Sequence, residues 1–277
     1  MFSLTSFRKN KLIKKVIDED IHIVMCCWKR TQHLEYQVKM LNNQSVAKKI
    51  HFHLVNNNQD NIELLDKKVL EFKKKYSNIT LYLSHYDNKY YGFQRFFYIK
   101  DNILENTLIN YVIIIDDDQY YDKYWVEKIY SIRQPKTYKG WHTRIFNNNI
   151  YLSNNDLNTK YVNYVGTGGC IIDSTIFDKT SKLWDIPNDL PDKVSVYNIE
   201  DLWLSFITNH YYNWSLEKSY LPELKTFNLP NSDSKQQQQC NGLYKYKQLL
   251  LTYLIEKGWN IKKKNNTNKI YKNNNIY

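Results

Sequence analysis

The sequence has no long hydrophobic run. Its longest apolar stretches are YVIII at 111–115 and LLLTYLI at 249–255, well short of the roughly 20 residues that a membrane-spanning helix needs. The first 20 residues also lack the apolar centre and the small-residue cleavage site of a secretory signal. We therefore expect a soluble protein of the cytosol, which is the host cell's cytosol if the gene is viral.

Cysteines are few and are not spaced like metal ligands. The four are Cys26, Cys27, Cys170 and Cys240. No pair has the Cys-x-x-Cys spacing of a zinc site, and Cys26 and Cys27 are adjacent within an apolar segment. This pattern favours buried, reduced thiols.

Acidic residues are outnumbered, and the formal net charge is +11 with a pI near 9.2. A basic protein attracts phosphates, nucleic acid or anionic lipid. However, lysine, asparagine, isoleucine and tyrosine all have AT-rich codons, so a biased genome would produce this composition without a functional cause. The lysines are also scattered rather than gathered on one helix. We therefore predict no specific nucleic-acid partner, while peripheral contact with a membrane stays open.

The first half of the chain alternates strands and helices. Apolar segments predict buried strands at 21–28, 49–58, 79–86 and 111–115. Apolar residues at helical spacing predict helices within 29–45 (capped by Thr31), 61–78 and 93–108. This alternation is typical of a parallel sheet with right-handed crossovers. Ligands of such sheets bind beyond the carboxyl ends of the strands.

The pattern changes after residue 122. Shorter strands follow, with Asn-rich turns at 147–149 and 154–155. We expect a helix at 198–210 and a last amphipathic helix at 243–259. His210 lies on the apolar stripe of the first of these helices, which favours a packed or helix-capping histidine over a metal ligand.

Three consecutive aspartates, Asp116, Asp117 and Asp118, follow the fourth predicted strand. Like charges side by side repel one another unless a cation shares the site. If the extended conformation continues, Asp116 and Asp118 share one side and Asp117 faces away. Two converging carboxylates form a hard oxygen site for Mg²⁺ or Mn²⁺, which can bridge them to a diphosphate. The alternative is an acidic loop that caps the next helix.

Two further segments contain residue types that are common in ligand-binding or catalytic sites. Gly166, Gly168 and Gly169 allow positive φ and close approach of the backbone to a ligand, or else form a bulged strand. Glu200 and Asp201 occupy the first turn of a predicted helix, where carboxylates are stabilised by the helix dipole. The functional alternative is that one of them acts as a general base.

Four segments, in this order and spacing, resemble GT-A glycosyltransferases and in particular their family-2-like members. They are IVMCCWKRTQHLEYQVKMLNNQ (23–44), the Asp-x-Asp at 116–118, YVGTGGCIID (164–173) and IEDLWLSF (199–206). The resemblance implies an α/β fold with a Rossmann-like, mixed but mainly parallel sheet flanked by helices, a small acceptor-side sheet and a C-terminal helix. The organisation it implies is an N-terminal extension (1–20), a nucleotide-sugar-binding half (21–122), an acceptor-binding half of the same domain (123–220), a C-terminal loop and helix (221–260) and a flexible tail (261–277).

The resemblance also implies an activity. It is the metal-dependent transfer of a sugar from a nucleoside-diphosphate sugar to a hydroxyl of a glycan or protein acceptor. The expected donor is a UDP-sugar, and the expected stereochemistry is inversion. Asp201 would be the general base and Glu200 would orient the acceptor or the base. Asp118 and Asp116 would hold Mn²⁺ or Mg²⁺.

The residues that the resemblance assigns to the nucleotide-sugar are Cys27, Trp28, Arg30, Asn57, Asn58, Arg95, Asp116, Asp117, Gly168 and Gly169. The acceptor candidates are Trp141, Arg144 and Trp203. Asparagines stand at 56–58, where the family often carries an acidic residue that binds the base, and this departure leaves the nucleobase open.

Two other classes of protein stay open. One is another phosphate-transfer enzyme on a similar sheet, either a sugar-1-phosphate nucleotidyltransferase or a two-metal nuclease. A nucleotidyltransferase needs a Gly-rich loop after its first strand, and CCWKRTQHL at 26–34 has no glycine. The other is a non-catalytic module that binds carbohydrate or nucleic acid, which would not hydrolyse a nucleotide-sugar.

Overall fold

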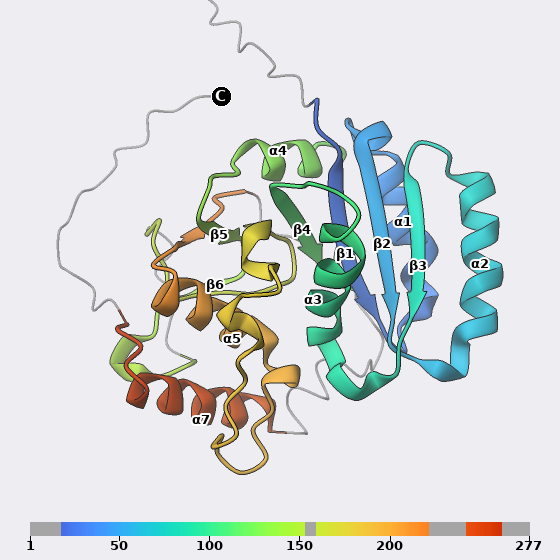
Figure 1. Ribbon diagram of the computed structural model, residues 1–277. Coiled ribbons are helices and arrows are strands. Elements are labelled where there is room, and N and C mark those ends of the chain that lie inside the picture. The colour runs from blue at the N-terminus through green and yellow to red at the C-terminus, as the bar shows by residue number, and fades with distance from the viewer. Residues whose placement is uncertain (1–17, 153–158, 222–241, 262–277) are drawn as a thin grey trace, which may run out of the picture.

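The computed structural model describes residues 18–152, 159–221 and 242–261 (Figure 1). Its main sheet has seven strands in the order β3-β2-β1-β4-β8-β5-β9, and a two-stranded sheet pairs β6 with β7. The strands are β1 (Ile21–Cys27), β2 (Ile50–Asn56), β3 (Thr80–His85), β4 (Tyr111–Ile115), β5 (Thr137–Gly140), β6 (Thr143–Arg144), β7 (Tyr164–Val165), β8 (Cys170–Asp173) and β9 (Ser215–Lys218).

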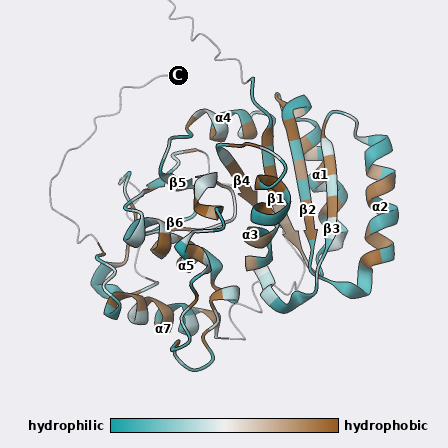
Figure 2. Ribbon diagram, viewed as in Figure 1, coloured by the Kyte–Doolittle hydropathy of each residue, from teal (hydrophilic) through white to brown (hydrophobic). Residues whose placement is uncertain are grey.

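Both faces of the main sheet are covered. The α-helices are α1 (Leu34–Asn42), α2 (Ile62–Lys75), α3 (Gln94–Tyr98), α4 (Trp125–Ser131), α5 (Glu200–Phe206) and α7 (Leu243–Glu256). Residues of α1, α2 and α4 form one apolar core against the sheet, and residues of α3, α5 and α7 form the core on the opposite face. Figure 2 shows the hydrophobic residues concentrated on the central strands.

Strand β1 shows how the sequence pattern builds these two cores. Ile23 and Met25 enter the core under α1, whereas Val24 between them enters the core under α3. This follows from the alternation of side chains along a strand. A strand buried on both faces must be apolar almost throughout, which is why 21–28 contains so few polar residues.

The expected fold class is confirmed. Strands β1–β4 are mutually parallel, as the strand–helix alternation predicts. β8 runs antiparallel to both β4 and β5, and β5 is parallel to β9. The sheet is therefore mixed but mainly parallel, and strands from the second half of the chain extend the sheet of the first half.

Several local expectations need correction or lie outside the described residues. Thr31 is not a helix cap, because it begins a 3₁₀ turn (η1, Thr31–His33) that precedes α1. Helix α4 was not expected, and it begins three residues after the point where the strand–helix pattern stops. The helix predicted at 198–210 begins at Glu200 and continues as a π-helical turn (η10, Ile207–Tyr211). The turn at 154–155, the tail from 262 and Cys240 lie outside the described residues.

The cysteines that the structure describes are free thiols. Cys27 and Cys170 are buried and Cys26 is half-buried. Within the described ranges, none of the helices combines the length and the apolar character needed to cross a bilayer.

Candidate active site

The aspartates directly follow the buried strand β4. The strand ends at Ile115, and Asp117 and Asp118 lie in a turn, so the extended conformation needed for Asp116 and Asp118 to share one side does not continue. Instead, Asp117 Oδ1 and Asp118 Oδ2 lie 2.5 and 2.6 Å from the guanidinium of Arg30. Asp116 turns toward Arg95, whose Nη1 lies 3.1 Å from Asp116 Oδ1.

Burial makes this acidic cluster costly. It raises the pKa of Asp117 to about 7, even though Arg30 lowers it. Burial and the neighbouring charge of Asp116 also raise the pKa of Asp118. Two arginines therefore neutralise three carboxylates only in part, and the site favours a further cation.

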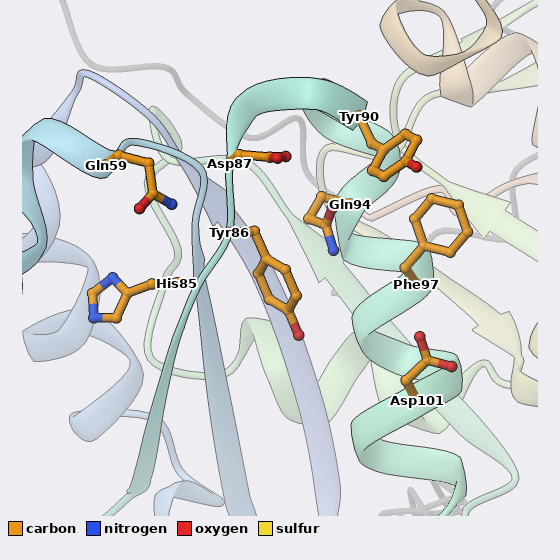
Figure 3. A pocket seen from close by; sticks show the side chains of 8 residues that line it. All are labelled: Gln59, His85, Tyr86, Asp87, Tyr90, Gln94, Phe97 and Asp101. Carbon is orange, nitrogen blue, oxygen red and sulfur yellow. The ribbon is translucent and has the colours of Figure 1, made fainter.

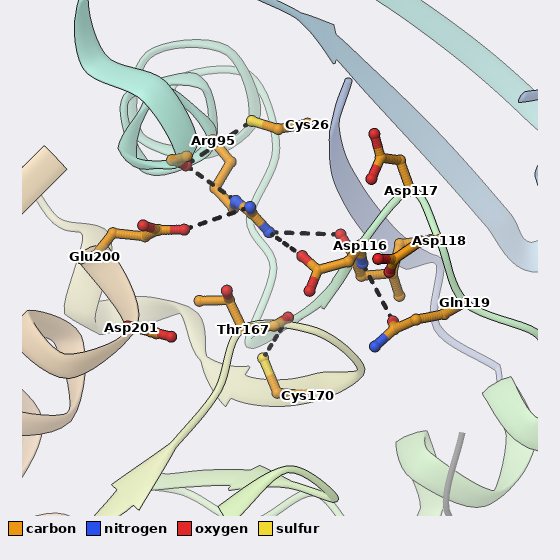
Figure 4. A network of polar contacts seen from close by, with 12 residues as sticks. Cys26, Arg95, Asp116, Asp117, Asp118, Gln119, Thr167, Cys170, Glu200 and Asp201 are labelled. Carbon is orange, nitrogen blue, oxygen red and sulfur yellow. Dashed lines mark hydrogen bonds and ion pairs between the residues drawn. The ribbon is translucent and has the colours of Figure 1, made fainter. Parts of the chain in front are cut away.

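Arg95 joins this cluster to a second pair of acids (Figure 4). Its Nη2 lies 3.4 Å from Glu200 Oε1, at the start of α5, and its Nε donates to the carbonyl of Gly92 at 3.0 Å. The carboxylate of Glu200 lies so close to Gly92 that a Cβ at that position would overlap it. Burial raises the pKa of Glu200 to about 7, although Arg95 opposes the shift.

The neighbouring Asp201 is in a different electrostatic environment. Its Oδ2 accepts hydrogen bonds from the Tyr164 hydroxyl and from Lys247 Nζ, the latter at 2.9 Å, and its Oδ1 accepts from the Leu202 amide at 2.7 Å. Burial acts to raise the pKa of Asp201, but Lys247 and Tyr164 outweigh it and the pKa is lowered. Two adjacent carboxyls thus have pKa values shifted in opposite directions.

The glycine segment lies between the three aspartates and the Glu200–Asp201 pair. A Cβ on Gly168 would overlap Asp116 Oδ2 and the side-chain amide of Gln119. Gly169 has a φ of 76° and donates its amide to Ile114 at 2.9 Å. Gly168 thus allows close approach to the Asp116 side chain and Gly169 allows a positive φ. Their contact with a ligand stays a prediction.

The residues assigned to the nucleotide differ in their surroundings. Asn57 donates to the carbonyl of Tyr91 at 2.6 Å, while its Oδ1 is buried without a hydrogen-bond partner in the described part of the chain. Asn58 Oδ1 instead accepts from the Asp60 amide at 3.1 Å and caps the next turn. Cys27 is a core residue, whereas Trp28 is half-buried just beyond β1.

The three acceptor candidates differ in whether their polar atoms have a partner. Trp141 Nε1 and Arg144 Nε are buried polar atoms without a hydrogen-bond partner among the residues that the structure describes. Buried polar groups are nearly always hydrogen-bonded, so such orphans call for a partner from outside the described residues. Trp203, by contrast, lies in the core, 2% exposed, and its Nε1 donates to Leu183 at 2.9 Å. His210 is packed as expected and stacks on Phe206 with ring centroids 4.9 Å apart.

Sequence reasoning missed several residues of the site. Lys247 comes from α7 and is 8% exposed, and the Tyr164 hydroxyl donates to Asp201. Gln119 Oε1 accepts from the backbone amide of Asp116 at 3.3 Å. His142 lies against Gly166 and packs on the ring of Tyr164, with burial lowering its pKa to about 4. One signal was present: Lys247 falls on the apolar stripe of its helix, four residues after Leu243 and three before Leu250.

The carboxylates have the chemistry of a partial metal site. The arginine contacts use Asp116 Oδ1 and Asp118 Oδ2, which leaves Asp116 Oδ2 and Asp118 Oδ1 as hard oxygen donors. Within the described ranges, no group of three or more His, Cys, Asp or Glu side chains is arranged to hold a metal. The oxygen donors present fit a divalent ion only if further ligands come from outside the described residues.

Comparisons with known proteins find similarity in structure alone. No protein-family profile matches the sequence, and a search of curated proteins finds no related sequence. Among solved structures, TarS 1–349 of S. aureus in complex with UDP-GlcNAc is 14% identical over 77% of this chain, with a TM-score of 0.48. The mannosyltransferase PcManGT from Pyrobaculum calidifontis, in complex with GDP-Man and Mn²⁺, is 10% identical over 72%, also with a TM-score of 0.48.

A structure of S. aureus TarS covers 72% of this chain at 14% identity, with a TM-score of 0.44. This chain spans 35%, 54% and 60% of the length of TarS, PcManGT and TarS 1–349, respectively. The chain is therefore similar to these proteins over a common part, at low sequence identity.

Proposed function

We propose that the chain is a glycosyltransferase that moves a sugar from a nucleoside-diphosphate sugar, preferably UDP-linked, to a hydroxyl of a glycan or protein. The observation that supports this most directly is the position of Arg95. It contacts Asp116 at the end of β4 and Glu200 at the start of α5. A site for diphosphate and a site for proton transfer are thereby held side by side.

The donor would lie over the carboxyl ends of β1, β2 and β4. Asn57 Oδ1 is a buried acceptor without a partner in the described chain, and it can receive the ring N–H of a pyrimidine. Asp116 would contact the ribose or the metal, and Arg30 and Arg95 would lie near the phosphates. A Mn²⁺ or Mg²⁺ ion on Asp118 and Asp116 would neutralise charge that develops on the leaving diphosphate.

The acceptor would react at Asp201. As the acceptor oxygen attacks the anomeric carbon from the face opposite the diphosphate, its proton passes to the Asp201 carboxylate. The bond from the anomeric carbon to the diphosphate oxygen breaks, and the products are an inverted glycoside and a nucleoside diphosphate. Lys247 and Tyr164 favour the ionised form of Asp201, so the carboxylate is unprotonated at neutral pH, and its lowered pKa also makes it a weaker proton acceptor.

Glu200 has a different role in this proposal. Its contact with Arg95 and its position on Gly92 make it the group that holds Arg95 between donor and acceptor. The opposite pKa shifts of Glu200 and Asp201 favour an enzyme over a binding module, because such separation marks distinct chemical roles.

The test is the variant Asp201→Asn. We expect it to lower the rate of sugar transfer by about a hundredfold or more, since it removes the general base, and to leave the affinity for the nucleotide nearly unchanged. Transfer is measured with UDP-, GDP- and dTDP-sugars, and nucleotide affinity by calorimetry. Asp192→Asn is the matched control, because Asp192 is exposed and should tolerate the same change. Full activity of Asp201→Asn would refute the assignment.

A further inference from the structure

A cavity of about 820 Å³ lies between the end of β3 and helix α3 (Figure 3). This volume is within the range of about 300–1,000 Å³ that is usual for ligand sites. The lining residues are Gln59, His85, Tyr86, Asp87, Tyr90, Gln94, Phe97 and Asp101. None of them belongs to the acidic cluster or to the Glu200–Asp201 pair.

One wall of the cavity is a single face of a helix. Gln94, Phe97 and Asp101 follow one another at spacings of three and four residues along α3 and its π-helical continuation η5 (Ile99–Leu104). Arg95 is rotated from Gln94 by about 100° and contacts Asp116 instead. Neighbouring residues of one helical turn therefore face two separate sites.

Gln94 presents its side-chain amide to this cavity. Residue Gln94 is 4% exposed, and its side chain points into the space (Figure 3). Its amide is not among the buried polar atoms that lack a partner, so it faces the open cavity. A ligand hydroxyl could bond to this amide in place of water.

The remaining lining chemistry restricts what the ligand can be. Three aromatic rings line it, those of Tyr86, Tyr90 and Phe97, although Phe97 also stacks on Trp184 with ring centroids 5.3 Å apart. Asp87 and Asp101 add carboxylates, and one oxygen of Asp87 already accepts from the Lys89 amide. No lysine or arginine lines the cavity, although the chain has a net charge of +11. Lys100 pairs with Asp101 at 3.2 Å but is not a lining residue. The two carboxylates disfavour phosphates and other anions, although Lys89 Nζ lies 5.1 Å from the centroid of the Tyr90 ring and Lys100 Nζ 5.3 Å from that of the Phe97 ring.

We propose that this cavity binds a neutral sugar residue of a glycan, distinct from the sugar that is transferred. A pyranose has an apolar C–H face that packs on an aromatic ring and hydroxyls that bond to amides and carboxylates. Such a second contact would raise the effective concentration of a glycan acceptor at the reaction site. The wall reaches that site directly, since Tyr90 packs on Tyr197, three residues before Glu200, with centroids 4.9 Å apart.

Calorimetric titration of the full chain with neutral trisaccharides, built in turn from glucose, galactose, mannose and N-acetylglucosamine, tests the proposal. At least one of them should bind. Gln94→Leu and Asp101→Asn should each weaken its binding by about threefold to tenfold, the usual effect of losing one hydrogen bond. The exposed carboxylate Glu71 on α2 supplies the matched control Glu71→Gln, which should bind as the wild type does. Affinity for UDP should be the same in all four proteins.

The proposal is overturned if no trisaccharide binds or if binding is unaffected by both variants. It is also overturned if uridine, a probe for a nucleoside, or tetramethylammonium, a probe for an organic cation, displaces the trisaccharide. Asp101 is exposed, so its variant stays informative if Gln94→Leu fails to fold. The inference rests on the proposed function, because it assigns the bound sugar to a glycan acceptor. The experiments nevertheless distinguish failure of the cavity proposal from failure of the proposed activity. Trisaccharide binding without sugar transfer would refute only the activity, and transfer without trisaccharide binding would refute only the cavity.

Discussion

At the scale of single residues, the charge on Asp201 depends on Lys247. The lysine is almost fully buried and its Nζ lies 2.9 Å from Asp201 Oδ2. An unpaired charge at this depth would be expensive, so the two groups stabilise one another's ionised forms. The pKa of Lys247 is raised accordingly, despite its burial.

Lys247→Met should therefore raise the pKa of Asp201. The acid limb of the rate–pH profile for transfer then moves to higher pH, because the carboxylate is ionised only at higher pH. Lys247→Arg should restore the original profile in part. The measurement is kcat against pH, with stability followed separately, since loss of one partner of a buried ion pair costs about 3–5 kcal/mol. Lys245→Met, exposed on the same helix, is the control, and an unmoved acid limb in Lys247→Met would contradict this role.

Gly168 should be as sensitive as a charged residue of the site. A Cβ at this position would overlap Asp116 Oδ2, so Gly168→Ala must displace the carboxylate or the loop. We expect a loss of about a hundredfold in kcat/KM, since misplacement by about 1 Å can have that effect. Gly242→Ala is the comparison for backbone strain alone, because a Cβ there meets no atom within 4 Å but the φ of 66° disfavours a side chain. It should lower stability and leave kcat/KM unchanged. Equal kcat/KM of the two variants would show that activity does not depend on the exact position of the Asp116 carboxylate.

At the scale of elements, three strands carry a stack of rings that takes no part in the proposed reaction. His22 of β1 bonds to His53 of β2 at 3.0 Å, and His53 bonds to the Tyr98 hydroxyl at 2.9 Å. His53 also stacks on Tyr82 of β3 with centroids 4.5 Å apart. Burial lowers the pKa of His22 to about 4 and that of His53 to about 3, with neighbouring histidines adding to both shifts.

This stack predicts a loss of stability in acid. Unfolded histidines take up protons near pH 6.5, whereas His22 and His53 in the folded state do so only near 4 and 3. The unfolded state therefore binds more protons below about pH 6.5, and stability falls from there as the pH drops toward about 4. Urea denaturation across this range measures the slope. His53→Gln should flatten it and His33→Gln should not, and the same slope in both variants would exclude the stack as the cause.

The elements themselves differ in how far the sequence predicts them. Strands β1–β4 are predictable because a strand buried on both faces must be an apolar run. The short segments YVIII and IHIVMCC are rich in β-branched and apolar residues and show no helical period. Helix α4 is short, and its sequence WVEKIYS shows too few turns for the apolar period to be clear. Thr31 has the residue type of a cap, but a 3₁₀ turn precedes the helix there and replaces the capping geometry.

At the scale of the whole molecule, the site depends on contacts that no local pattern encodes. The acidic positions 116–118, 200 and 201 are predictable, because charges at the ends of buried elements need a function or a partner. The partners are not predictable: Arg95 is separated by 105 positions from Glu200, and Lys247 by 46 from Asp201. Likewise, the sequence indicates Trp141, Arg144 and Trp203 equally as acceptor contacts. Only the folded chain shows that Trp203 Nε1 has a partner, whereas Trp141 Nε1 and Arg144 Nε have none among the described residues.

The central claim is that the aspartates beyond β4, together with Arg30 and Arg95, form a site for a divalent ion and a nucleoside diphosphate. The most direct measurement is the thermal unfolding of the full chain with UDP, GDP and dTDP, each with and without Mn²⁺. A ligand at a hundredfold excess over its Kd stabilises the folded state by about 2.7 kcal/mol. We predict stabilisation by one nucleotide together with Mn²⁺, lost in Asp118→Asn and retained in Asp201→Asn. Stabilisation that persists in Asp118→Asn, or no stabilisation by any nucleotide, would contradict the account.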